Sequence, residues 1–105
     1  MKIKARIKIP YKKVAEFCRK WNIQELALFG SVLREDFRPD SDVDVMVSFT
    51  QEAKYSLFDL VRMQGELEEI FEREVDLVEK KAVEQSENYI RRKHILDSTE
   101  VLYVA

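Results

Sequence analysis

Residues 28–47 read LFGSVLREDFRPDSDVDVMV, and this stretch is the most informative part of the chain. It holds the pair Gly30-Ser31 and, after ten intervening residues, Asp42-Val43-Asp44. The first element is a glycine turn whose backbone can approach a phosphate, and the second is a pair of carboxylates spaced to hold a divalent cation. Neither element means much alone, since Asp40 and Asp42 also stand two residues apart. The two elements together, at this spacing, indicate a site that binds both a phosphate and a divalent cation.

Apolar and polar residues alternate along residues 42–49 with the period of a β-strand. The alternation predicts a strand over Val43–Phe49 with one buried, valine-rich face. Asp42 and Asp44 then project from the opposite face, near the start of the strand. Two carboxylates held together repel each other, so this arrangement calls for a bound cation.

Gly30 is one of only two glycines in the chain, and it directly follows the apolar run Leu26–Phe29. A strand that ends in Gly-Ser and leads into a short helical turn leaves backbone N–H groups free, and these suit an anionic phosphate. The alternative is an ordinary turn that ends a strand. The aspartates that follow at this spacing favour the phosphate site.

The Gly-Ser-x10-Asp-x-Asp pattern resembles the signature of the DNA polymerase β-like nucleotidyltransferase superfamily. Arg34, the run 39–42 and Val47 are similar to its smallest branch, the minimal nucleotidyltransferases (MNT). The resemblance extends from about Ile9 to the C-terminus. It implies an α+β, single-domain polymerase β-like nucleotidyltransferase fold, with helices packed against a mixed sheet. One departure is Glu35, which stands where the branch often has glycine.

The resemblance also implies a third acidic residue on a later strand, and Asp76 within Val75–Val78 supplies it. On this basis Asp42, Asp44 and Asp76 are the expected catalytic residues and the expected ligands of two Mg²⁺ ions. Asp76 is expected to serve the ion nearer the attacking hydroxyl.

The same resemblance assigns the nucleotide, most often ATP, to the glycine turn. Gly30 and Ser31 are expected to hold the triphosphate through backbone N–H and hydroxyl groups. Arg34 is expected to neutralise phosphate charge, and Ser41 to support the loop through a local hydrogen bond.

Charge is distributed unevenly along the chain, although the net charge is only −2. Residues 1–20 carry eight Lys and Arg against one Glu, whereas residues 21–79 carry five basic against fifteen acidic residues. An acidic active segment repels a triphosphate unless divalent cations intervene, which favours metal dependence. It also argues against direct nucleic-acid binding, which requires a basic face.

A chain of 105 residues fits one domain, which we expect to span 1–105. No apolar run is long enough to span a membrane, and the N-terminus does not resemble a signal peptide. The single cysteine, Cys18, excludes an internal disulfide and fits a reducing compartment. We therefore expect a cytoplasmic protein, with self-association left open.

Strand and helix patterns alternate along the chain. Residues 1–9 are expected to form an extra edge strand or a basic arm, and later strands are expected near 25–29, 43–49, 74–78 and 100–104. Helices are expected near 11–22, 56–73 and 87–96. The first helix buries a stripe made of Val14, Phe17, Cys18 and Trp21. The second is expected to bury Leu57, Leu60, Val61, Leu67, Ile70 and Phe71.

Minimal nucleotidyltransferases are often paired with a small helical HEPN ribonuclease, as antitoxin and toxin. The resemblance therefore implies transfer of AMP from ATP to a hydroxyl, expected to be a tyrosine, of a cognate HEPN toxin. Two alternatives stay open. One is a non-catalytic antitoxin that acts by occlusion, and the other is a nucleotidyltransferase for a small-molecule acceptor held by a separate subunit.

Overall fold

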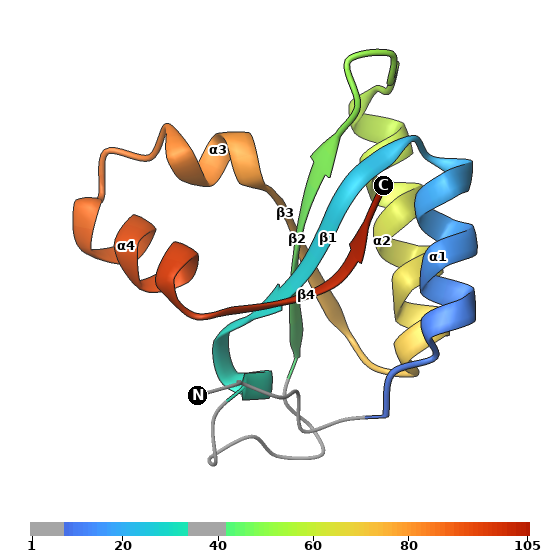
Figure 1. Cartoon of the computed structure of the whole chain (residues 1–105), viewed down its shortest axis with the longest axis horizontal. Coiled ribbons are helices and arrows are strands. Elements are labelled where there is room, and N and C mark those ends of the chain that lie inside the picture. The colour runs from blue at the N-terminus through green and yellow to red at the C-terminus, as the bar shows by residue number, and fades with distance from the viewer. Residues whose placement is uncertain (1–7, 34–41) are drawn as a thin grey trace.

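A four-stranded sheet with the order β3-β2-β1-β4 organises the chain (Figure 1). The structure is a computed structural model that describes residues 8–33 and 42–105. Its elements are α1 (Tyr11–Lys20), β1 (Ile23–Phe29), the 3₁₀ turn η1 (Gly30–Leu33), β2 (Val43–Phe49), α2 (Leu57–Phe71), β3 (Val75–Glu79), α3 (Lys80–Glu84), α4 (Tyr89–Asp97) and β4 (Thr99–Val104).

The sheet is mixed, as predicted. Strand β1 pairs antiparallel with both β2 and β4, whereas β2 and β3 are parallel. The parallel pair follows from the crossover by α2, because a helix between two strands returns the chain in the same direction. The α+β fold class expected from the sequence is therefore confirmed. The expected strand over residues 1–9 falls largely on 1–7, which lie outside the described residues.

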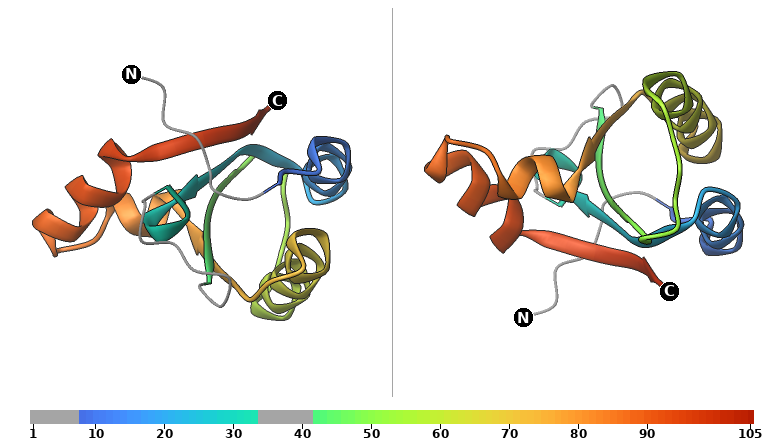
Figure 2. Two further views of the ribbon diagram at one scale, coloured as in Figure 1. Left: turned by 90° about the horizontal axis from the view of Figure 1, so that it is seen from below. Right: turned by 90° about the horizontal axis from the view of Figure 1, so that it is seen from above.

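The larger core lies between the sheet and the pair α1 and α2 (Figure 2). Helix α1 contributes Val14, Phe17 and Cys18, all buried, and Trp21 just after it is half-buried. Helix α2 starts at a capping box in which Ser56 Oγ accepts from the Asp59 N–H and Asp59 Oδ2 accepts from the Ser56 N–H, at 3.3 and 3.0 Å. This reciprocal pair satisfies N–H groups that a helix start leaves without partners.

The opposite face of the sheet carries a second, smaller core. It joins Ala27, Phe29 and Met46 of the sheet to Val83 of α3 and Ile95 of α4. The prediction that β2 has only one buried face was therefore wrong, because Met46 is 4% exposed on the side expected to face solvent. The reason is α3, a short helix that the sequence pattern did not reveal, which folds over this side together with α4.

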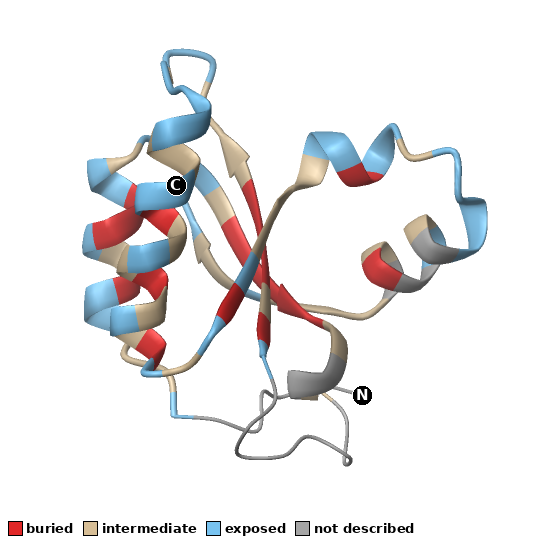
Figure 3. Ribbon diagram, turned by 180° about the vertical axis from the view of Figure 1, so that it is seen from behind, coloured by how far each residue is buried: buried red, intermediate tan, exposed pale blue. Residues whose placement is uncertain are grey.

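The predicted inner face of α2 was wrong in part. Leu67 and Phe71 are buried and Met63 joins them, but Leu57 and Val61 are 79% and 72% exposed. Residues three and four apart share a helix face, and the stripe that meets the sheet passes through Met63, Leu67 and Phe71. Leu57 and Val61 fall to one side of that stripe, as the exposed first turns of α2 show (Figure 3).

Two glutamates of α2, Glu66 and Glu68, make specific contacts with other elements. Glu66 accepts hydrogen bonds from Lys20 Nζ and Trp21 Nε1 at 2.8 and 3.0 Å, which joins α2 to the end of α1. Glu68 Oε2 accepts from the Val75 N–H at 3.1 Å, which joins α2 to the start of β3. Within the described part of the chain, no helix is long and apolar enough to cross a membrane.

Candidate active site

Asp44 and Asp76 are paired residues on the neighbouring parallel strands β2 and β3. Paired residues of adjacent strands present their side chains on the same face, and the strands lie about 4.8 Å apart. Asp44 is half-buried and Asp76 is exposed. The same Asp44 is also the partner of Phe29, the last residue of β1. The ends of three sequence segments therefore meet at Asp44.

Gly30, immediately after Phe29, lies against the Asp44 side chain. Its φ of +78° is in the left-handed region that favours glycine. A Cβ placed at Gly30 would overlap Asp44 Oδ2 and would lie 3.2 Å from Asp44 Cγ. Both the backbone conformation and the available space thus require glycine here. The main chain at the start of η1 therefore lies directly against the Asp44 carboxylate.

Asp42 stands just before β2 and is exposed. The main chain between Asp42 and Asp44 is anchored, because the Val43 N–H donates to the Glu74 carbonyl at 2.9 Å. Together with the bond from Val75 to Glu68, this contact aligns the starts of β2 and β3. Glu68 thereby positions the strand that carries Asp76. The sequence offered no signal for this role, because the helical pattern of α2 marks Glu68 only as polar.

The other predicted site residues are described only in part. Ser31 belongs to the η1 turn directly after Gly30. Arg34 and Ser41 lie outside the described residues. The structure therefore brings together Gly30, Asp44 and Asp76, and Asp42 lies two residues before Asp44, just outside β2.

The donor chemistry of these residues fits a hard divalent cation. Carboxylate oxygens are the ligands that Mg²⁺ prefers, and Mg²⁺ is usually bound by one or two carboxylates together with substrate phosphates. Across residues 8–33 and 42–105, no three His, Cys, Asp or Glu side chains converge as a ready-made metal cluster. The Asp44 and Asp76 pair beside the η1 turn suits an ion whose coordination is completed by a nucleotide.

The far end of β3 is held by two side-chain contacts. Tyr55 Oη donates to Glu79 Oε2 at 2.7 Å, and Lys80 Nζ lies 3.2 Å from Glu25 Oε1. The hydrogen bond to Glu79 raises the pKa of Tyr55, with small additions from burial and from the Glu79 charge. The Tyr55 ring stacks on Phe49, with ring centroids 4.1 Å apart. These contacts connect the loop before α2 to the sheet.

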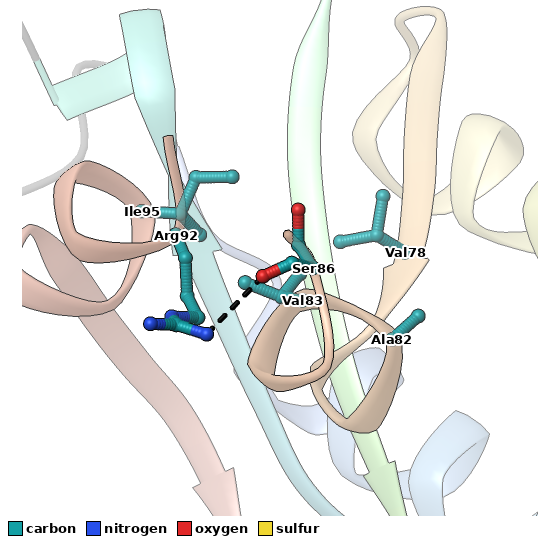
Figure 4. Close-up of a pocket in the computed structure, with 6 residues that line it drawn as sticks. All are labelled: Val78, Ala82, Val83, Ser86, Arg92 and Ile95. Atoms are coloured by element: carbon teal, nitrogen blue, oxygen red, sulfur yellow. Dashed lines mark hydrogen bonds between the residues drawn. The ribbon is translucent and has the colours of Figure 1, made fainter. Parts of the chain in front are cut away.

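A small apolar pocket of about 170 Å³ lies on the face of β3 that carries Asp76. Val78, two residues after Asp76, forms one wall, and Val83 and Ile95 form others (Figure 4). Arg92 stands at its rim and donates to the Ser86 carbonyl at 3.1 Å. The pocket depends on α3, a helix that the sequence pattern did not predict.

Cys18 is not a candidate nucleophile. It is fully buried in the larger core, and burial raises the pKa of its thiol to about 12. Since the thiolate is the reactive form, this residue is chemically inert in the folded chain. The expectation that Cys18 is a core residue is confirmed.

A mixed sheet that brings paired aspartates beside a glycine turn is the arrangement of a nucleotidyltransferase. The sequence profile described as the nucleotidyltransferase domain matches residues 11–100, and this chain belongs to that family. It is therefore a nucleotidyltransferase, and its resemblance to the minimal branch is confirmed. A relative from Methanocaldococcus jannaschii, provisionally named a protein adenylyltransferase, is 39% identical over 67 residues, covering 64% of this chain and 70% of the relative.

Two solved structures share the fold. A crystal structure of a toxin–antitoxin with AMP-PNP superposes with a TM-score of 0.69 at 18% identity, covering 92% of this chain and 75% of that chain. A complex of a tri-AMPylated HEPN toxin from Shewanella oneidensis with its MNT antitoxin has a TM-score of 0.61 at 18% identity, covering 90% of this chain and 70% of that chain. At this level of identity the two structures establish the fold of the chain.

Proposed function

We propose that this protein transfers the AMP group of ATP, in a Mg²⁺-dependent reaction, to a hydroxyl of a cognate HEPN ribonuclease toxin. The expected acceptor is a tyrosine, and the modification silences the toxin, so the protein acts as an antitoxin. The name of the Methanocaldococcus jannaschii relative and the AMPylated toxin in the Shewanella oneidensis complex support this proposal. The domain is proposed to span residues 1–105, with residues 1–9 as an edge strand or arm.

The observation that carries the proposal is the contact between Gly30 and the Asp44 carboxylate, with Asp76 as the strand neighbour of Asp44. A phosphate bound by the N–H groups of the glycine turn would lie directly beside two carboxylates. That juxtaposition is electrostatically unfavourable without a cation, and it becomes a binding site when a Mg²⁺–nucleotide complex occupies it.

In the proposed reaction, the acceptor oxygen attacks the α-phosphorus of ATP, and the bond from that phosphorus to the bridging oxygen breaks. AMP is then attached to the acceptor, and pyrophosphate leaves. Positioning and charge neutralisation supply most of the catalysis in such a displacement. When bound, two Mg²⁺ ions would activate the attacking hydroxyl and stabilise the charge on the leaving oxygens.

Each site residue then has a distinct role. Asp42, Asp44 and Asp76 would hold the ions, and the Asp76 carboxylate would also accept the proton of the attacking hydroxyl. The turn at Gly30 and Ser31 would bind the triphosphate through main-chain N–H groups. Arg34 as a phosphate ligand and Ser41 as a support of the loop remain predictions.

The test is to incubate the purified protein with Mg²⁺-ATP and a purified cognate HEPN protein, and to measure the mass of that partner. We expect added AMP on tyrosine, and none with the Asp42→Asn/Asp44→Asn double variant. A partner that stays unmodified but is inhibited equally by both proteins would identify a non-catalytic binding antitoxin. AMP found on a small molecule instead would identify an acceptor held by a separate subunit.

A further inference from the structure

Three large apolar side chains project into solvent from the first two turns of α2. Leu57, Phe58 and Val61 are 79%, 83% and 72% exposed, and we call them the α2 patch. Single exposed apolar residues are common on protein surfaces, but a contiguous apolar group of this kind marks an interaction site. Two of the three were expected in the core, so their exposure is a property of the tertiary structure.

A shallow groove of about 230 Å³ runs between the α2 patch and β3. Leu57 and Val61 line one side, and Leu77, Val78 and Glu79 line the other. Strand β3 is at the edge of the sheet formed by the described residues. An edge strand beside an apolar helix face offers both main-chain and side-chain contacts to a protein partner.

Gly65 extends this surface by one turn beyond Val61. It lies inside α2 and is exposed, and a Cβ built there would meet nothing within 4 Å. Glycine is unfavourable inside a helix, and no contact within the described structure requires it at this position. Leu57, Val61 and Gly65 are spaced four residues apart, so they share one side of the helix. The glycine leaves a low point where the backbone of a partner can approach α2 closely.

The groove and the proposed site share strand β3, because Val78, which lines the groove, is two residues after Asp76 and lies on the same face of that strand. Asp76 immediately precedes Leu77 on β3, and three residues of strand separate it from Glu79, about 10 Å. In phosphoryl transfer the attacking and leaving oxygens lie roughly in line. If the triphosphate is held at Gly30 on the β1 side, the attacking hydroxyl must arrive from the β3 side.

Charge indicates what kind of molecule occupies this surface. Residues 56–79, which include α2 and β3, carry eight acidic and two basic residues; Glu79 lines the groove itself, and Glu66 is paired with Lys20 of α1. A two-fold dimer would place this acidic surface against its own copy, and the two would repel. A partner with an apolar centre surrounded by Lys and Arg is complementary. A protein that itself binds nucleic acid has such basic surfaces.

We propose that the α2 patch and the groove beside β3 are the docking surface for the acceptor protein, which presents an apolar patch rimmed by basic residues and places its hydroxyl at Asp76. This inference rests on the proposed function, because that function supplies the acceptor. It assigns docking to the acidic middle of the chain and not to its basic ends.

The test compares a Leu57→Ser/Val61→Ser variant with a matched control, Ile90→Ser/Val104→Ser. The control residues are 79% and 64% exposed on α4 and β4, away from the groove. The probe is the purified cognate HEPN protein, titrated by calorimetry. We expect the Kd to rise about tenfold or more for the patch variant and to change less than about threefold for the control. Stabilisation by Mg²⁺-ATP in thermal melts should be equal in all three proteins.

Equal affinities for the patch variant and the wild type would overturn the docking surface, even if AMP transfer is normal. Sedimentation of the chain alone tests whether the patch binds a second copy. If the wild type is a dimer and the patch variant is a monomer, the occupant is a second copy, and the docking proposal is wrong. Failure of the proposed function has a different signature. In that case the partner binds through the patch, but no AMP is transferred.

Discussion

The α-carbon of Gly30 lies against the carboxylate of Asp44, so that the end of β1 and the start of β2 meet without an intervening side chain. This contact joins the two halves of the Gly-Ser and Asp-x-Asp pattern in space. It also makes the two glycines of the chain an informative pair, because Gly65 has open space where Gly30 has none.

Gly30→Ala should therefore destabilise the fold and abolish nucleotide binding. The left-handed backbone costs an alanine about 1 kcal/mol, and the overlap with Asp44 adds to that cost. Gly65→Ala should act in the opposite sense and stabilise α2 by up to about 1 kcal/mol. Urea unfolding measures both changes. A Gly30→Ala protein as stable as the wild type, and still stabilised by Mg²⁺-ATP, would contradict the close contact.

Asp42→Asn and Asp44→Asn should each abolish AMP transfer while the fold stays intact. Asp42 is exposed, and removing its charge from an acidic segment should leave stability in metal-free buffer unchanged or slightly higher. Thermal melts with and without Mg²⁺-ATP, alongside a transfer assay, test both statements. Asp59→Asn, at the start of α2, is not a suitable control because it breaks the capping box. Glu69→Gln, on the exposed side of α2, keeps the same change of charge without that loss.

Asp76→Asn should lower the rate of transfer by orders of magnitude and change the affinity for Mg²⁺-ATP far less. The proposed role of Asp76 concerns the attacking hydroxyl more than the triphosphate, so kcat is the parameter that falls. Calorimetric titration with Mg²⁺-ATP and single-turnover transfer separate the two effects. If this variant transfers AMP at the normal rate, Asp76 has no role in the reaction.

Stability should fall in acid partly through Glu66. Burial opposes ionisation of this carboxyl, but the hydrogen bonds from Lys20 and Trp21 outweigh it and hold the pKa of Glu66 below its usual 4.5. A carboxyl whose pKa is lower in the folded state stabilises the fold above its unfolded pKa, and the stabilisation is lost as pH falls through the folded pKa. Glu66→Gln should thus be less stable than the wild type at pH 7, with the difference shrinking below about pH 4.5.

Chemical unfolding of both proteins between pH 3 and pH 7 measures this difference, and Glu69→Gln is again the matched control. A gap between wild type and Glu66→Gln that stays constant across the range would show that the Lys20, Trp21 and Glu66 contacts act by packing and not by charge.

Much of the site follows from local sequence. The alternation of residues 42–49 predicted β2 with its observed bounds, Val43–Phe49, because the period of a strand is a short-range property. The unusual placement of a rare glycine after an apolar run located the turn, since only glycine accepts its φ of +78° without cost. Asp76 was identified through the family resemblance, as Val75–Val78 does not reveal by itself which strand it will join.

Tertiary structure alone decided the rest. The pairing of Asp44 with Asp76 depends on the α2 crossover, which sets which strands are neighbours and in which register. Met46 is buried because α3 and α4 fold over the second face of the sheet, and Leu57 and Val61 are exposed because the contact stripe of α2 passes beside them. A hydrophobic pattern in the sequence indicates which residues can be buried. Which of them are covered depends on contacts between segments distant in the sequence, and these exist only in the folded chain.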